Sequence, residues 1–326
     1  MVQARLHVVT GKGGTGKTTV AAALALHLAS DGRRVLLIEV EGRQGIAQLF
    51  DVPPLPYEER KVALARAGGD VFALAVDPED ALYEYLDMYY RLGRAGKALR
   101  RFGVVEFATT VAPGVRDVLL TGKAYEAVRR RSGQQFTYDA VVMDAPPTGR
   151  IGRFLNVNAE VAGLAKVGPI RRQADAIMEL LHSPRTAVHL VTMLEEMPVQ
   201  ETADAVAELT ALQLPIGSII VNQVRPPRLD EMQQAAARDD SLDRQELEGG
   251  LKAAGLSAHS GLARALLRGA TAHVDRLDLE SRERLRLQQL TPPLAELPWL
   301  ADGVDLAALY EIADLLGEHS RTGRSW

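Results

Sequence analysis

Short apolar runs of four to six residues, rich in Val, Ile and Leu, recur along the chain and are separated by longer stretches of mixed polarity. Such runs are typical of strands that are buried on both faces of a parallel sheet. The runs that we predict to be strands span residues 6–9, 35–38, 71–76, 140–143, 187–192 and 217–221. Helical stretches alternate with them, so the pattern predicts an α/β fold with a doubly wound, mainly parallel sheet.

Helical periodicity fills most of the remaining chain. Clear examples are residues 19–30, 199–212 and 306–316. Between residues 77 and 131 helical signals appear without a strand, and we predict a helical cap subdomain from insertions at about 78–131 and 159–183. We expect residues 1–326 to form a single domain. The polar, Ala-rich stretch 225–243 contains a Pro-Pro turn and is expected to be a surface excursion.

Composition excludes several classes of protein. The 326 residues carry 38 Lys+Arg and 42 Asp+Glu, and this small acidic excess argues against a nucleic-acid partner. No apolar run approaches the roughly 18 residues that span a bilayer, and the N-terminus lacks a signal-peptide pattern, so we expect a cytoplasmic protein. The absence of Cys excludes disulfides, cysteine nucleophiles and thiolate sites for zinc.

The strongest chemical motif lies at residues 11–18, between a predicted strand and a predicted helix. Its sequence, GKGGTGKT, matches the G-x-x-x-x-G-K-[ST] phosphate loop. Glycines let backbone N–H groups approach phosphate oxygens, and the helix N-terminus adds its positive dipole end. We predict that Lys17 binds the β/γ-phosphates and that Thr18 offers its hydroxyl to Mg²⁺. The predicted phosphate-binding residues are Gly11, Lys12, Gly13, Gly14, Thr15, Gly16, Lys17, Thr18 and Thr19.

Lys12 is a second lysine in a loop that needs only one. A cation at this position cannot easily fold onto its own nucleotide while the loop wraps the phosphates. It could serve a nucleotide bound by a facing subunit, as an in-trans cation does in phosphoryl transfer. The alternative is a solvated surface lysine.

Two further polar residues end predicted strands. Asp144 follows the run 140–143 and precedes a stiff Ala-Pro-Pro-Thr-Gly turn, so it can hold the water shell of Mg²⁺ while the turn senses the γ-phosphate. The alternative is an Asp without a functional role. Asn222 follows the run 217–221, where its amide can donate to and accept from an adenine edge or can simply close a turn.

These motifs resemble a known family. The loop K-G-G-x-G-K-T-T is similar to the deviant Walker A motif shared by MinD/ParA, the nitrogenase iron protein and ArsA. Residues 144–155, DAPPTGRIGRFL, resemble the D-T-A-P-T-G-H-x-x-R-F-L stretch of ArsA-type ATPases, which include the arsenical-pump ATPase and the GET-pathway targeting factor. Further likenesses, in the family's order, lie at residues 71–82, 113–117, 195–202, 219–223 and 297–300.

The resemblance implies a Mg-ATP-dependent ATPase that is switched by nucleotide as a homodimer or as a heterodimer with a related ATPase. It implies handling of a membrane-protein client or of a membrane transporter. Lys12, Glu41 and Asp144 would be the catalytic residues, and Asn222 and Pro298 would lie on the adenine side. Two alternatives remain, a slow or non-hydrolysing nucleotide-gated scaffold and a ParA/MinD-like positioning ATPase.

The sequence departs from the family in its first switch. The family reads S-T-D-P-A-H-N there, whereas residues 39–45 read EVEGRQG. Glu41 keeps a carboxylate on an arm longer by one methylene, and a water-positioning group must sit within about 0.5 Å of its place. Hydrolysis could therefore be slow or need partner-induced closure. Gln44 could orient the water instead, and Glu41 could be a solvated loop acid.

The partner side departs as well. Without Cys the chain has neither the zinc staple nor the thiolate arsenite site of some relatives. One phosphate loop means one nucleotide site per chain, so a composite site needs a dimer. Apolar residues of the cap, within 82–92 and 104–120, form a client groove in targeting relatives, but they could equally pack a core.

Overall fold

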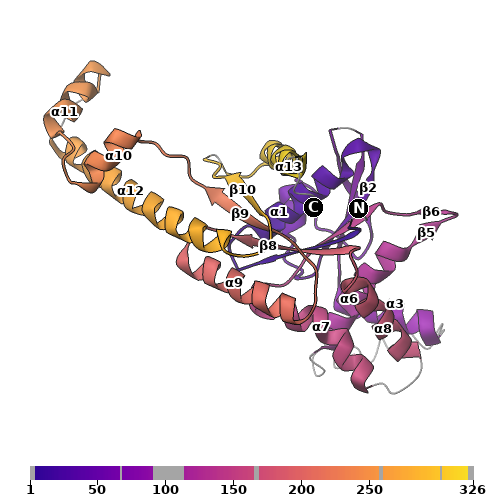
Figure 1. The fold of residues 1–326 in the computed structure, drawn as a ribbon. Coiled ribbons are helices and arrows are strands. Elements are labelled where there is room, and N and C mark those ends of the chain that lie inside the picture. The colour runs from indigo at the N-terminus through magenta and orange to yellow at the C-terminus, as the bar shows by residue number, and fades with distance from the viewer. Residues whose placement is uncertain are drawn as a thin grey trace.

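One large sheet with helices on both faces forms the centre of the molecule (Figure 1). The structure, a computed structural model, describes residues 4–66, 68–90, 114–164, 169–256, 260–301 and 303–321. The strand order is β10-β9-β8-β1-β7-β2-β4-β3, and only β3 runs antiparallel to its neighbour. The strands are β1 (Leu6–Gly11), β2 (Arg34–Glu39), β3 (Arg60–Leu64), β4 (Asp70–Ala75), β7 (Ala140–Asp144), β8 (Thr186–Thr192), β9 (Ile216–Val224) and β10 (Leu294–Pro298). The predicted doubly wound, mainly parallel fold is confirmed.

All six predicted strands are present, as β1, β2, β4, β7, β8 and β9. The sequence analysis missed β3 and β10, which are the two edge strands of the sheet. An edge strand has a neighbour on one side only and needs less apolar sequence. Both strands mix exposed or half-buried positions with buried ones, unlike the fully buried β1, β7 and β8.

Two hydrophobic cores lie on opposite faces of the sheet. On β2, Val35 and Leu37 belong to the core beneath α1, whereas Leu36 and Ile38 belong to the core on the other side. The first core is covered by α1 (Lys17–Ala29), α2 (Gly45–Leu49) and α13 (Leu306–Arg321). The second is covered by α6 (Val115–Arg129), α7 (Thr148–Leu164), α8 (Pro169–Leu181) and α9 (Glu196–Ala211). The predicted helices at residues 19–30, 199–212 and 306–316 are thus confirmed as α1, α9 and α13.

Helix α3 (Pro78–Tyr90) adds to the cover of the second core. It packs against α6. The predicted cap insertions overlap α3, α6, the end of α7 and α8, and residues 91–113 and 165–168 lie outside the described residues. Of the apolar cap residues, Leu119 and Leu120 are buried in the core, while the side chains of 85–90 also lie outside the described part. Short connections are η1 (Ser30–Gly32) and the hairpin of β5 (Arg131–Ser132) with β6 (Gln135–Phe136).

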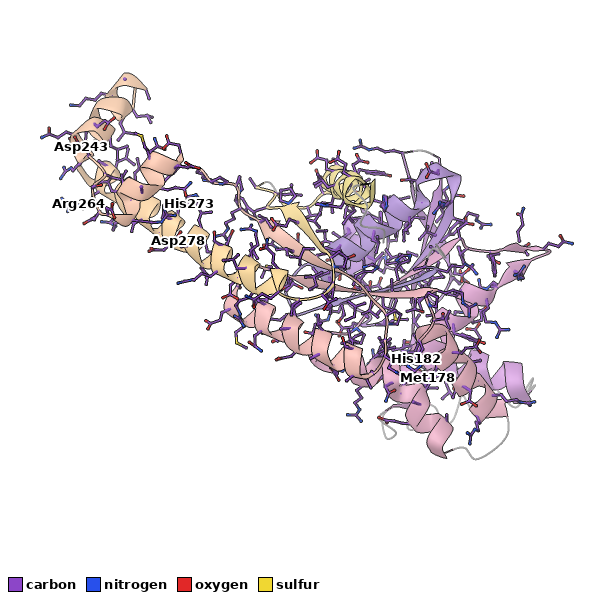
Figure 2. All side chains as sticks on the ribbon, in the orientation of Figure 1. Met178, His182, Asp243, Arg264, His273 and Asp278 are labelled. Carbon is purple, nitrogen blue, oxygen red and sulfur yellow. The ribbon has the colours of Figure 1, made fainter. Side chains whose placement is uncertain are left out.

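A helical arm leaves the sheet after β9 and returns to it before β10. It consists of α10 (Glu231–Arg238), α11 (Arg244–Ala253) and α12 (Ser260–Gln288). The arm projects away from the sheet in Figure 1. In Figure 2 the labelled Asp243, Arg264, His273 and Asp278 lie on its outer part, at the end of the molecule opposite Met178 and His182. Its inner part lies against α9, where Arg276 pairs with Glu195 at 2.8 Å. The expected surface excursion at 225–243 is therefore the start of this larger arm.

The long α12 raises the question of a membrane span. None of the helices in the described ranges combines the length with the apolar character that crossing a bilayer requires.

Two buried histidines lie side by side on neighbouring strands of the sheet. His7 on β1 and His189 on β8 stack with ring centroids 5.4 Å apart, and His7 Nδ1 lies 3.1 Å from His189 Nε2. Burial lowers the pKa of both rings, that of His7 to about 4, so the pair is neutral at neutral pH. The ring of His189 lies over Gly217 of β9, where a Cβ atom would come within 2.5 Å of His189 Cε1.

We expect Gly217→Ala to lower the free energy of unfolding by about 1–3 kcal/mol, because the added methyl overpacks the buried ring. Urea denaturation followed by circular dichroism measures this change. Gly249→Ala on the exposed part of α11 is the matched control, since a Cβ there meets no atom within 4 Å. That control should be neutral or slightly stabilising. Equal stability of Gly217→Ala and wild type would contradict the described packing.

Candidate functional site

The loop of residues 11–18 runs from the end of β1 into the start of α1, as the sequence predicted. Gly14 and Gly16 have φ values of +90° and +87°, in the left-handed region that favours glycine. A Cβ on Gly16 would come within 2.4 Å of Asn222 Nδ2, and one on Gly11 within 2.2 Å of the Val191 carbonyl oxygen. Glycine is therefore required at these positions by conformation or by space.

Asn222 fastens this loop to the neighbouring part of the sheet. It lies buried near the end of β9, and its Nδ2 donates to the carbonyl oxygen of Thr15 at 2.9 Å. Pro298 ends the adjacent strand β10, where it is paired with Val224. The structure thus brings Asn222 and the loop into contact, and Pro298 lies beside them at the same edge. Their predicted adenine contacts stay predictions.

Thr18 and Asp144 meet beneath the loop. Thr18 Oγ1 donates to Asp144 Oδ2 at 2.7 Å, although the two residues are 126 positions apart. The other carboxylate oxygen, Asp144 Oδ1, is buried and has no hydrogen-bond partner. Buried polar atoms are rarely left unpaired, and a carboxylate beside a hydroxyl is a donor set that Mg²⁺ prefers. The residues present therefore fit a magnesium ion, held directly or through its water shell.

Burial and neighbouring carboxylates disfavour the charged form of Asp144. The pKa of Asp144 is raised to about 6, chiefly by burial, and the nearby carboxylates of Glu39 and Glu41 act in the same direction. The hydrogen bond from Thr18 and the charge of Lys17 act against this rise. Lys17 is itself buried at 8% exposure. A bound divalent cation would favour the ionised carboxylate.

We expect Asp144→Asn to stabilise the protein free of nucleotide and Mg²⁺ at pH 8, by at most about 3 kcal/mol. The folded pKa lies above the unfolded one, so the carboxyl adds stability below its unfolded pKa and that stability is lost as the pH rises through about 6. Urea denaturation in EDTA measures the difference. It should shrink to about 1 kcal/mol at pH 4.5. A variant less stable than wild type at pH 8 would contradict this account.

The first switch is anchored by Glu39, a residue to which the sequence analysis assigned no role. The Glu39 carboxylate accepts hydrogen bonds from Gln44 N at 2.5 Å and from Ile46 N at 3.2 Å, at the start of α2. These bonds hold Gly45 against Thr18. A Cβ atom built on Gly45 would lie only 3.2 Å from Thr18 Cγ2. A lone acid at the end of an otherwise apolar strand was the available signal.

Glu41 and Gln44, the two candidates for orienting water, lie differently. The Gln44 amide accepts from the Leu55 N–H at 2.7 Å and donates to the Leu55 carbonyl at 3.1 Å, so it fastens its own loop. Glu41 lines a small cavity of about 110 Å³ together with Arg116, Asp117 and Arg150. Glu41 thus lines the cavity between its own switch loop and α6, and its charge still reaches Asp144.

Lys12 does not stand free in solvent. Its ammonium forms an ion pair with Glu201 on α9, and both side chains are about one-third exposed, at 31% and 32%. The second oxygen of Glu201 accepts a hydrogen bond from Thr148 Oγ1 at 3.1 Å. Thr148 begins α7 within residues 144–154, which we call the second switch. One carboxylate therefore binds both the phosphate loop and the second switch, and the sequence analysis had assigned Glu201 no role.

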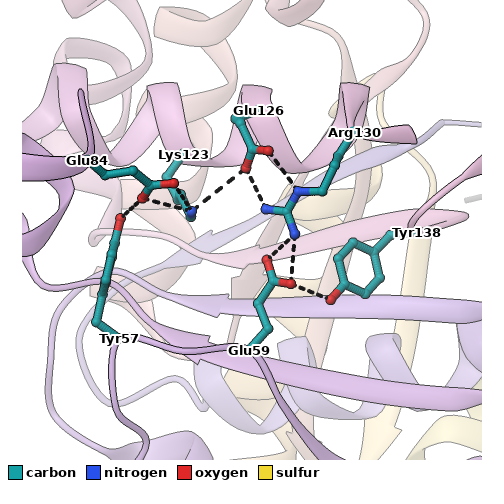
Figure 3. Close-up of polar contacts among 7 residues, drawn as sticks. All are labelled: Tyr57, Glu59, Glu84, Lys123, Glu126, Arg130 and Tyr138. Carbon is teal, nitrogen blue, oxygen red and sulfur yellow. Dashed lines mark hydrogen bonds and ion pairs between the residues drawn. The ribbon is translucent and has the colours of Figure 1, made fainter. Parts of the chain in front are cut away.

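A polar network connects the loop that precedes β3 to the cap helices (Figure 3). Glu59, in the loop that precedes β3, accepts two hydrogen bonds of 2.7 Å from Arg130 at the end of α6. Tyr57 in the same loop donates to Glu84 on α3, and Lys123 on α6 also binds Glu84, at 2.8 Å. Since Gln44 is bonded to Leu55, this loop joins the nucleotide side of the molecule to α3 and α6.

Known proteins of one family resemble this chain. Residues 4–184 and 164–248 match the family model described as anion-transporting ATPase, of the ArsA type. The chain is 54% identical over 315 residues to ATPase BagA of Mycobacterium tuberculosis, across 96% of this chain and 93% of that protein. It is 27% identical to the arsenical pump-driving ATPase of Acidiphilium multivorum, across 72% of this chain and 40% of that protein. It is 26% identical to ATPase GET3 of Kluyveromyces lactis, across 68% and 73%.

Proposed function

The chain belongs to the ArsA-type anion-transporting ATPase family, and from this premise we propose that it binds Mg-ATP at the loop of residues 11–18 and hydrolyses it as a nucleotide-dependent dimer. The family membership confirms the resemblance drawn from the sequence, and enzymes of this family use a nucleotide and Mg²⁺. The observation that carries the proposal is the Thr18–Asp144 pair beneath the loop, with one buried carboxylate oxygen lacking a partner.

Residues in the phosphate loop and around it divide the binding of Mg-ATP in this proposal. Lys17 binds the β/γ-phosphates, and its burial strengthens the interaction because water competes little there. Thr18 and Asp144 hold Mg²⁺, which neutralises charge on the phosphates when bound. Asn222 contacts the adenine after exchanging its bond to Thr15, with Pro298 beside it.

Hydrolysis needs a cation and an oriented water near the γ-phosphate. We assign the cation to Lys12 of a facing subunit, because its own loop leaves this side chain at the surface beside α9. Glu41 orients the water once the first switch closes on the nucleotide. Its place in the cavity beside Arg116 supports a slow rate in the absence of a partner.

The cap would respond to nucleotide through the loop that contains Tyr57 and Glu59. Closure of the first switch moves Gln44, which is bonded to Leu55, and thereby moves the two residues that hold α3 and α6. We propose that this movement couples ATP hydrolysis to a membrane-protein client or to a membrane transporter. The names of two relatives, a pump-driving ATPase and GET3, support this class of output.

A slow nucleotide-gated scaffold is the second candidate, and one observation favours it. Glu41 lines the cavity between its own switch loop and α6 and pairs with Arg43 of the same loop at 3.8 Å, whereas Thr18 and Asp144 are hydrogen-bonded to each other. A scaffold would bind ATP and dimerise without appreciable turnover. A ParA/MinD-like positioning role has less support, because residues 144–155 follow the ArsA-type pattern.

Phosphate release from ATP, measured in Mg²⁺ and in excess EDTA, tests the proposal. We expect release only in Mg²⁺, with a rate per chain that rises with protein concentration because the complete site requires two subunits. ATP binding and dimerisation without phosphate release would favour the scaffold. Failure to bind ATP at all would contradict both candidates. A Glu41→Gln variant held in ATP would then trap the closed state for identification of its partner.

A further inference from the structure

We propose that Glu201 is a positioning residue that holds Lys12 on its own subunit in the resting state and releases it when a nucleotide on the facing subunit competes for it. The inference rests on the proposed in-trans role of Lys12 and extends it to the state that precedes dimer closure. Glu201 then determines how readily the composite site assembles. In this proposal it acts through Lys12 and Thr148, the two residues that it contacts.

The geometry supports a holding contact rather than an incidental one. Lys12 pairs with one oxygen of Glu201, and Thr148 Oγ1 donates to the other at 3.1 Å. The carboxylate therefore lies between the two nucleotide-responsive segments, the phosphate loop and the start of α7. Thr10 Oγ1 also donates to the Pro146 carbonyl at 2.6 Å, so the second switch is held against β1 in the same state.

The Lys12–Glu201 ion pair is weak enough for the phosphates of ATP to replace Glu201. Both side chains are about one-third exposed, and ion pairs at this level of exposure are weak. The polyphosphate of ATP carries more negative charge than one carboxylate and offers several acceptors, so it can outcompete Glu201 when a facing subunit presents it. When Lys12 moves to that nucleotide, Glu201 stays bonded to Thr148 alone. The second switch then loses its link to the phosphate loop and can rearrange.

The rate at which Lys12 is acylated in the nucleotide-free protein tests the Lys12–Glu201 ion pair directly. Brief acylation of lysines, quantified at Lys12 by mass spectrometry, should be roughly 2–5-fold faster in Glu201→Gln than in wild type, because the pair that restrains the amine is weakened. Lys252 on α11 provides the internal reference. Glu195→Gln is the matched control, since Glu195 precedes the same helix but pairs with Arg276 of the arm.

This measurement does not depend on ATP, so it separates the inference from the proposed function. Unchanged Lys12 reactivity in Glu201→Gln overturns the inference even if the protein is an active ATPase. Faster Lys12 acylation supports it even if wild type shows no turnover, an outcome that would contradict the proposed function alone.

The functional consequence is tested by ATP-dependent dimerisation and turnover at a series of protein concentrations. Glu201→Gln should lower the concentration that gives half-maximal dimer by roughly 2–5-fold, and the same substitution should have no effect in a Lys12→Ala background. An unchanged or raised midpoint would overturn the inference. An equal effect with and without Lys12 would overturn it too, because Glu201 would then act through another residue.

Discussion

Lys17→Ala should weaken ATP binding by roughly 100-fold, because the ammonium makes charge-assisted hydrogen bonds to the β/γ-phosphates that no neighbouring cation can replace. Lys17 is buried at the start of α1, next to the Thr18–Asp144 pair. Titration of a fluorescent ATP analogue, followed by competition with ATP, measures the change. Unaltered affinity would show that the nucleotide binds elsewhere.

A charge-matched control separates this local effect from a change in net charge. Lys61 on β3 pairs with Asp70 at 2.6 Å at the far edge of the sheet. Lys61→Ala should therefore leave ATP affinity within about twofold of wild type. If both variants lost affinity equally, the loss would reflect general electrostatics and not the phosphate loop.

Lys12→Ala should have the opposite profile, with ATP affinity nearly retained and turnover reduced by roughly 10³-fold. In the resting state Lys12 is bound to Glu201, and in the proposed mechanism it acts only on the facing subunit's nucleotide. Steady-state phosphate release together with equilibrium binding separates the two effects. Lys252→Ala on α11 serves as the control for loss of one lysine.

A fall in affinity as large as that of Lys17→Ala would place Lys12 in its own subunit's site instead. Normal turnover in Lys12→Ala would remove it from the reaction altogether. Either result would contradict a nucleotide site that is shared between two subunits. The assignment of the phosphates to the loop of a single chain would still stand.

The centre of this fold could be predicted from sequence because its strands are buried on both faces. The strands β1, β7 and β8 are buried along their whole length, so their apolar runs are unambiguous. The arm could not be predicted in this way. Two of the buried positions of α12 are acids, Glu280 and Glu283, whose charges are satisfied by Arg276 and Arg286 on the same helix. Such a helix has no continuous apolar stripe to recognise.

In the candidate site, too, some residues could be predicted from sequence and others could not. The phosphate loop is a local pattern, and Asp144 follows a strand that the parallel sheet brings beside β1, with Val9 opposite Asp144. Both could be located from sequence. The partner of Lys12 could not, because Glu201 lies 189 positions away on α9 and looks like an ordinary helical surface acid. The anchoring role of Glu39 likewise depends on the loop geometry around Gln44.

Mixing two inactive variants determines whether each nucleotide site is completed by Lys12 of a facing subunit. Lys12→Ala keeps a whole phosphate and magnesium site but supplies no in-trans lysine, whereas Asp144→Asn supplies Lys12 but has an impaired magnesium site. Mixed dimers should contain one complete site. About half of randomly assorted dimers are mixed, so an equimolar mixture should recover about a quarter of wild-type turnover. A mixture no more active than the average of the two variants alone would contradict the account.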